Sequence, residues 1–164
     1  MTYGSSPIAA LIMGVIVAVA WPSPALAATG KARVAGLSDV SFGLIAGTAD
    51  QAASQSVCVF SSTTTAGYSV TATGSGTGGS FALTGGPALL PYDVLWSGNA
   101  NQSSGAALVA GVTTSGFTSL ATQQTCNSGP SATASLTVII RASTLSAASA
   151  GSYSGTLQIT IAPE

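Results

Sequence analysis

The chain has 164 residues, only 4% of them are charged, and it contains no histidine. A typical globular chain is about 25% charged, so the polar surface must come from Ser, Thr, Asn, Gln and Gly, and it offers little electrostatic repulsion between molecules. The missing histidine excludes Ser-His-Asp and Cys-His catalytic arrangements and the usual zinc ligand sets.

The chain begins with a segment typical of a secretory signal peptide. Residues 8–21 are almost continuously apolar, but the run is shorter than the about 20 residues that a membrane-spanning helix needs. Ala25 and Ala27 then supply the small residues of an A-x-A cleavage site. We therefore predict a signal peptide over residues 1–27 and one mature domain over residues 28–164. The alternative is an uncleaved membrane anchor.

The mature chain shows the period-two alternation of half-buried β-strands and no helical periodicity. The alternating segments are residues 40–44, 68–73, 90–96, 136–141 and 153–161. Clusters of turn-forming residues separate them at residues 74–79, 85–87, 97–105 and 127–130. Only residues 46–53 are rich in helix-forming residues. Short strands separated by such turns predict an all-β sandwich or barrel.

The two cysteines are Cys58 and Cys126. In an exported protein an even number of cysteines predicts a disulfide. The bridge would close a long loop, for which the chain-entropy model gives a contribution of about 4 kcal/mol. The alternatives are two buried free thiols or a bond between two molecules.

We predict no catalytic, cofactor-binding or metal site, and therefore no enzyme. The run Gly74-Ser-Gly76-Thr-Gly-Gly79 matches G-x-G-x-x-G, but strand-like sequence follows it in place of the helix that would receive a pyrophosphate. A flexible connection between strands is the better interpretation. The basic residues Lys31, Arg33 and Arg141 are scattered, so they do not form the basic patch that nucleic-acid binding needs.

Several short motifs occur in an order typical of one family. They are Val40-Ser41-Phe42-Gly43, Ser56-Val57-Cys58, Gly67-Tyr68-Ser69-Val70, Leu90-Pro91-Tyr92-Asp93-Val94 and the run from Ala150 to Leu157. Together they resemble the spore coat protein U-like domain, the pilin module of archaic chaperone–usher pili, over most of residues 39–164. The resemblance implies an immunoglobulin-like β-sandwich that lacks its final strand. A periplasmic chaperone would lend that strand, and an outer-membrane usher would exchange it for the N-terminal extension of the next subunit.

The resemblance also implies roles for two segments. The apolar face of Leu157, Ile159 and Ile161 is expected to line the groove that accepts a strand. A donor segment needs alternating bulky residues, and Val34 and Leu37 are the only sizeable apolar residues of the mature chain before the first motif. The chain would therefore either donate a weak strand or accept one without donating, as a tip or accessory subunit.

These observations lead us to expect a subunit of a surface pilus or fimbria, exported through the periplasm, with a role in adhesion or biofilm formation. Its expected partners are a periplasmic chaperone, an outer-membrane usher and other pilus subunits, and the sequence names no receptor. The alternatives are a stand-alone secreted or surface-associated β-sandwich that binds carbohydrate or matrix, and an outer-membrane or coat structural protein of another kind. Tyr92 and Trp96 are candidates to stack on a sugar, although their alternation with Leu90 and Val94 favours core positions.

Overall fold

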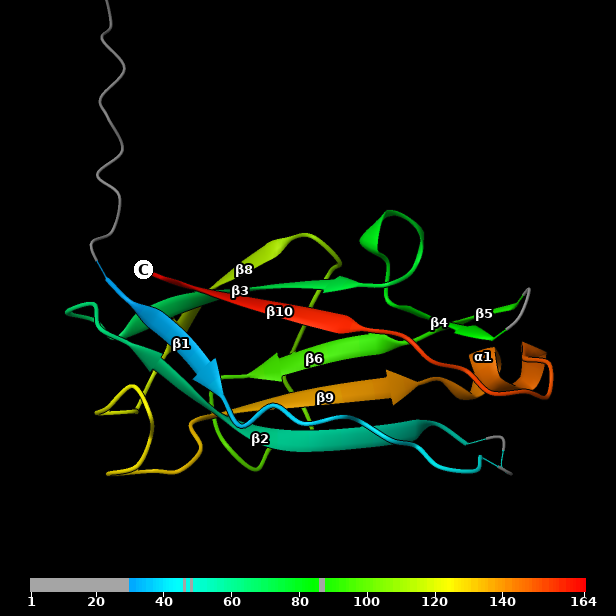
Figure 1. Cartoon of the computed structure of the whole chain (residues 1–164), viewed down its shortest axis with the longest axis horizontal. Helices are drawn as coiled ribbons and strands as arrows, with labels where there is room; N and C mark the ends of the chain where they lie inside the picture. The colour runs from blue at the N-terminus through cyan, green and yellow to red at the C-terminus, as the bar shows by residue number, and fades with distance from the viewer. Residues whose placement is uncertain (1–29, 46, 48, 86–87) are drawn as a thin grey trace, which may run out of the picture.

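The computed structural model describes residues 30–45, 47, 49–85 and 88–164, and nearly all of its regular structure is β-strand (Figure 1). The strands are β1 (Ala32–Ala35), β2 (Gln51–Ser61), β3 (Gly67–Gly74), β4 (Ala82–Gly85), β5 (Ala88–Pro91), β6 (Asp93–Ser97), β7 (Ala106–Ala107), β8 (Thr113–Thr118), β9 (Ala134–Ile140) and β10 (Leu157–Pro163). One short helix, α1 (Ala142–Ala147), follows β9. The all-β prediction is confirmed. The predicted signal peptide, with Ala25 and Ala27, lies outside the described residues.

The strands form two facing sheets and a separate hairpin. One sheet has the order β1-β2-β9-β6-β7, the other has the order β10-β3-β8, and β4 pairs with β5. Every pairing is antiparallel. The chain crosses repeatedly from one sheet to the other (Figure 1), which makes the domain a β-sandwich.

Alternate side chains of both sheets fill the space between them. Tyr68 and Val70 of β3 are fully buried, and they belong to the same core cluster as Val94 and Trp96 of β6. The indole N–H of Trp96 donates a hydrogen bond of 3.3 Å to the Tyr68 hydroxyl and so joins the two sheets. Tyr92 is buried too, so both aromatic residues considered for sugar stacking lie in the core.

The strand predicted over residues 40–44 is wrong for this structure. These residues belong to no strand of the described chain. Gly43 has a φ of 62°, in the left-handed region that glycine favours. The alternation breaks there, because Phe42 packs against the core whereas Leu44 is 95% exposed.

Other predicted elements are shifted or divided. The described part of residues 46–53 is not helical and enters β2 at Gln51, because pairing of β2 with β9 outweighs the weak helix preference of a few alanines. The strand predicted over residues 90–96 is divided at Tyr92, and its halves pair in different sheets. The glycine cluster forms a short 3₁₀ turn at Thr77–Gly79 that leads to β4, so it is a connection between strands.

A disulfide joins Cys58 in β2 to Cys126 in the loop before β9, with Cα atoms 6.2 Å apart. Both cysteines are buried in a small cluster with Ala121. The predicted bridge is confirmed, and the alternatives of free thiols or an intermolecular bond do not apply to this structure. Among the described residues, no helix has the length and apolar character required to cross a membrane.

Candidate functional site

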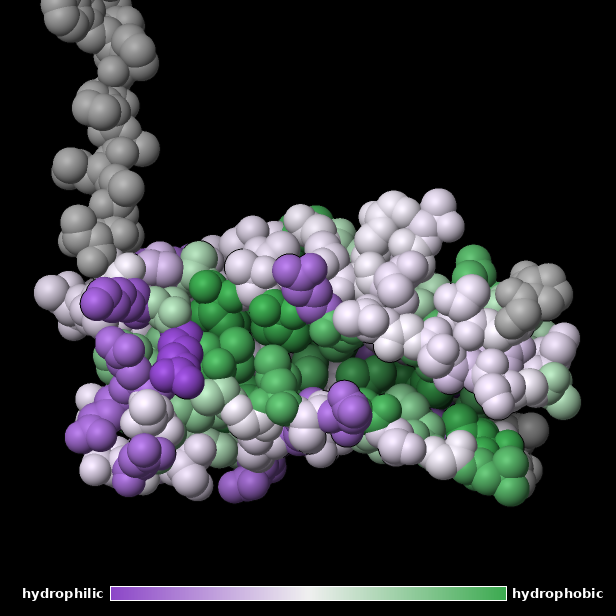
Figure 2. All heavy atoms as spheres, in the orientation of Figure 1, coloured by the Kyte–Doolittle hydropathy of each residue, from purple (hydrophilic) through white to green (hydrophobic). Residues whose placement is uncertain are grey.

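A groove of about 1140 Å³ with an apolar floor opens along β10. Its floor consists of core side chains from the facing sheet and the β4–β5 hairpin. These floor residues are Leu83, Leu90, Tyr92, Leu136, Val138 and Ile140. Figure 2 shows apolar surface gathered in a hollow between β10 and the edge of the sheet that contains β2 and β9.

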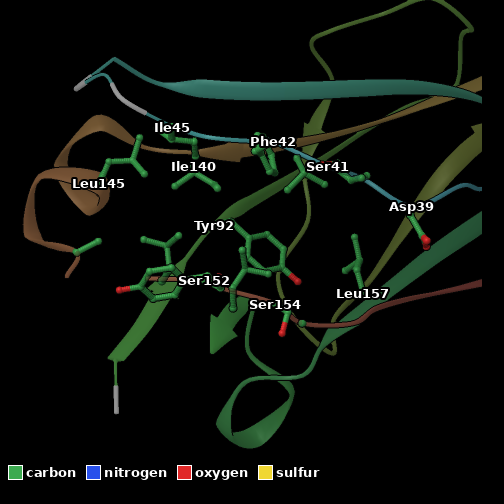
Figure 3. Close-up of a pocket in the computed structure, with 18 of the residues that line it drawn as sticks. Asp39, Ser41, Phe42, Ile45, Tyr92, Ile140, Leu145, Ser152, Ser154 and Leu157 are labelled. Carbon is green, nitrogen blue, oxygen red and sulfur yellow. The ribbon is translucent and has the colours of Figure 1, made fainter. Parts of the chain in front are cut away.

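The two walls of the groove come from distant parts of the chain. One wall is formed by Leu157 and Ile159 of β10 with residues 148–156 before it. The other wall is formed by residues 37–45, which we call the strap. In the close-up, Phe42 and Ile45 of the strap lie across from Leu157, with the Tyr92 ring between them (Figure 3).

The backbone beside the groove has unused hydrogen-bonding groups. β10 pairs with β3 along one edge, from Leu157 opposite Gly74 to Pro163 opposite Tyr68. In the described part of the chain no strand pairs with the other edge of β10. Within the same part, the strap makes no backbone–backbone hydrogen bond. Because exposed strand edges are templates for another strand, the groove has the chemistry to accept an extended segment.

The structure places the predicted acceptor residues on one face of β10. Leu157 and Ile159 line the groove, whereas Ile161 packs against the same core but lies outside the lining. Of the predicted donor residues, Val34 lies outside the lining and Leu37 lies within it. Val34 is in β1, half-buried and paired with Val59, and Leu37 is 42% exposed on the strap. Donation by Val34 would require β1 to leave β2, and that role stays a prediction.

The sequence does not predict that most residues of the floor and of the second wall belong to a groove. The alternation over residues 136–141 does predict a half-buried strand, but it does not say that Leu136, Val138 and Ile140 would face an open space. Phe42 belongs to a motif that the sequence places in a strand. Its position in the wall depends on how the strap runs past β2, which no local pattern indicates.

The groove is nearly free of charge. Asp39, near one end, is the only charged residue among those that line it (Figure 3). Arg141 lies outside the lining and binds Asp93 at 2.6 Å and Asp50 at 3.0 Å. Asp50 also accepts a hydrogen bond from the Ala142 amide at 2.7 Å. These bonds, first to the Ala142 amide and then to Arg141, hold the pKa of Asp50 below its usual value.

The described residues offer no cluster of three or more His, Cys, Asp or Glu side chains that could hold a metal ion. The lining contributes hydrocarbon, hydroxyl groups and unpaired backbone. A neutral, mostly apolar and extended ligand is therefore the kind that fits.

Neither a protein-family model nor a curated protein matches the chain. A comparison with solved structures finds a chain from the chaperone–tip adhesin complex of CFA/I fimbriae biogenesis, with a TM-score of 0.52 and 17% identity. The likeness is one of fold. It covers 81% of this chain and 41% of the other, so this chain spans less than half of that chain's length. It agrees with the predicted immunoglobulin-like sandwich, whereas membership of the spore coat protein U-like family stays a prediction.

Proposed function

We propose that this chain is a structural subunit of a surface pilus or fimbria whose fold is completed by a strand from another chain. The observation that supports this proposal most directly is the groove, with its apolar floor, between the unpaired edge of β10 and the strap. Strand addition uses these two features, because backbone hydrogen bonds supply affinity and alternate side chains fill apolar pockets. The shared fold with a chain of a fimbrial chaperone–tip adhesin complex supports the proposal.

In this proposal a periplasmic chaperone fills the groove first, and an outer-membrane usher exchanges its strand for one from another subunit at the cell surface. The chain acts without enzymatic chemistry, since its sequence contains no histidine and few ionisable groups. Its place is at a tip or in an accessory position, because the mature chain before Asp39 offers only Val34 and Leu37 as bulky donor side chains. Adhesion or biofilm formation would be the result of assembly.

A charge placed in the groove tests the proposal. Ile159→Lys puts an ammonium group on the groove wall, whereas Thr160→Lys puts the same group on the exposed face of β10. Fibres are sheared from cells that produce each full-length variant with its chaperone and usher, and the chain is quantified in fibres and periplasm. We expect Ile159→Lys to be lost from fibres and Thr160→Lys to be retained.

Two further measurements make the outcome decisive. Electrophoresis without reductant reports whether Ile159→Lys still forms the Cys58–Cys126 bridge, and so separates failure to fold from failure to assemble. Equal incorporation of both lysine variants would refute the proposal. A wild-type chain that is monomeric without a chaperone and that takes no strand or extended peptide into the groove would also refute it, and would support a stand-alone secreted sandwich.

A further inference from the structure

The loop that follows β6 lies against the outer face of the larger sheet. Since Ala134 and Leu136 of β9 are core residues, Ser135 between them is on the opposite, outer face. Ser135 is nevertheless only 2% exposed. Its hydroxyl accepts the Gln102 amide at 3.0 Å and donates to the Asn99 carbonyl at 2.9 Å. The loop therefore covers part of this face and is bonded to it.

A second set of bonds joins the same loop to β2. The Ser56 hydroxyl accepts the Asn101 amide at 2.9 Å and bonds to the Asn101 side-chain carbonyl oxygen at 3.1 Å. Asn101 has a φ of 58°, in the left-handed region that asparagine adopts more readily than most residues. At the end of the loop, a Cβ at Gly105 would collide with the Trp96 carbonyl group. The loop is thus held at both ends of its path across the sheet.

A cavity of about 250 Å³, which we call the outer pocket, lies between this loop and β2. Every residue in its lining carries a hydroxyl or a carboxamide group. They are Ser54, Gln55, Ser56, Asn101, Gln102 and Ser103. Three groups on the loop side make no hydrogen bond to another described residue: the Asn101 side-chain NH₂, the Gln102 side-chain carbonyl oxygen and the Ser103 hydroxyl. Both donors and acceptors are therefore available to a ligand.

The composition of the lining limits the chemistry of that ligand. No charged side chain lines the outer pocket to pair with an ion, and no aromatic or aliphatic side chain lines it to receive an apolar group. Hydroxyl and carboxamide groups both donate and accept hydrogen bonds, so they match the hydroxyl groups of a sugar. The volume is below the about 300–1,000 Å³ of typical small-molecule pockets. A single sugar residue, or the end of a longer glycan, is the ligand that fits.

The outer pocket is separate from the groove. Gln55 is the one residue that lines both, and its carboxamide is engaged by Ser38, at 2.9 Å from the Ser38 amide and 3.1 Å from the Ser38 carbonyl. Gln55 therefore forms a shared rim and is not a ligand group. Because Tyr92 and Trp96 are buried in the core, a sugar on this chain would have to be held by hydrogen bonds of such a polar site.

We propose that the outer pocket binds one neutral saccharide residue through the side chains of Asn101, Gln102 and Ser103. Ser56 and Ser135 are positioning residues, which hold the loop in place before the sugar arrives and so reduce the ordering cost of binding. A few neutral hydrogen bonds give an affinity on the order of millimolar, which repeated copies on one surface would raise. This inference goes beyond the proposed pilus role and does not require the groove to accept a strand.

Saturation-transfer difference NMR tests the inference with the full chain. The probes are the methyl glycosides of glucose, galactose and mannose, together with N-acetylglucosamine, each at millimolar concentration. We expect magnetisation to pass from the protein to at least one of these neutral sugars, and titration of that sugar gives its affinity. No transfer to any of the probes would overturn the inference.

A double variant shows whether the sugar occupies the outer pocket. Gln102→Ala with Ser103→Ala removes two ligand groups but keeps the backbone bond of residue 102 to Ser135 and the contact of Asn101 with Ser56. The loop should therefore stay in place. We expect the affinity for the sugar to fall about tenfold.

Gln51→Ala with Ser104→Ala is the matched control. Each glutamine, Gln51 and Gln102, donates from its side chain to the carbonyl two residues before it, but neither Gln51 nor Ser104 lines the outer pocket. The control should bind the sugar as the wild type does. Equal affinity of the two double variants would place the sugar elsewhere and overturn the inference. Sugar binding and incorporation into fibres are measured separately, so either proposal can fail without the other.

Discussion

Hydroxyl groups take part in the buried side-chain hydrogen bonds of the described residues. Thr133 Oγ1 accepts the Val59 amide at 2.9 Å and donates to the Val59 carbonyl at 3.0 Å, and Ser119 Oγ donates to the same carbonyl. Among the described residues, no buried polar side-chain atom lacks a partner. A sequence that is 4% charged can therefore bury polar residues without leaving them unsatisfied.

Tyr68→Phe should destabilise the domain by about 1–3 kcal/mol, because it leaves the buried indole N–H of Trp96 without its acceptor. Chemical denaturation followed by tryptophan fluorescence measures the change. Tyr153→Phe is a suitable control, since the Tyr153 hydroxyl bonds to Ser149 at the exposed surface. Equal loss in both variants would contradict the argument.

Glu164 makes the domain sensitive to acid. Its Oε2 accepts the Gly116 amide at 3.1 Å, and bonds from Ser115 and then Gly116 keep its pKa below the usual 4.5. The unfolded chain therefore takes up protons more readily than the folded one, so this stabilisation is present above pH 4.5 and is lost as pH falls toward the lower folded pKa.

We expect the urea midpoint of the wild type to be constant near neutral pH and to fall below about pH 5. Glu164→Gln should show a shallower fall. Adding Asp50→Asn should flatten it further, because the pKa of Asp50 is also lowered. An unchanged slope in the double variant would show that other groups control acid stability.

Prediction from sequence succeeds for two inner strands of the sandwich. β3 and β9 were expected from alternation, and both pack against the core on one face and pair on both edges. Part of the strap was expected as a strand, but no strand of the described residues pairs with its backbone. The alternation did not predict β1, β2 or β8, because their pairing depends on neighbouring strands rather than on a pattern of their own. The family resemblance predicted that Leu157 and Ile159 line the groove. The floor of the groove could not be predicted, because it depends on how distant strands meet.

The loop between β8 and β9 depends on the disulfide. The bridge spans a sequence separation of 68 residues, for which loop-closure entropy gives about 4 kcal/mol. We expect the double variant Cys58→Ala with Cys126→Ala to lose about that much free energy of unfolding in chemical denaturation. A loss below about 1 kcal/mol would contradict the loop-closure estimate and would indicate residual structure in the unfolded chain.

The molecule has three basic and four acidic residues. At its surface, Arg141 forms ion pairs with both Asp50 and Asp93. Little charge remains to guide association over a distance. Assembly through the groove would therefore depend on apolar contact and backbone hydrogen bonds, which salt screens weakly.

A synthetic peptide of about nine residues that alternates valine and threonine has the neutral, extended character that suits the groove. We expect its affinity for the chain to change by less than about twofold between about 0.05 and 0.5 M NaCl. Isothermal titration calorimetry measures it, and Asp39→Lys reverses the one charge in the lining. A steep loss of affinity with salt in the wild type would mean that electrostatic attraction, rather than shape and backbone pairing, selects the partner.

The Cys58–Cys126 bridge also closes a covalent ring that contains β3 to β8, while β1, β9 and β10 lie outside it. If tension is applied through the two ends of the domain, the ring cannot unravel. At about 3.4 Å a residue, it withholds roughly 230 Å of extension from the pulled chain. Both edges beside the groove lie in the part that can be drawn out, so a stretched domain would yield at the groove while β3 to β8 stay held in one closed loop from which it can refold.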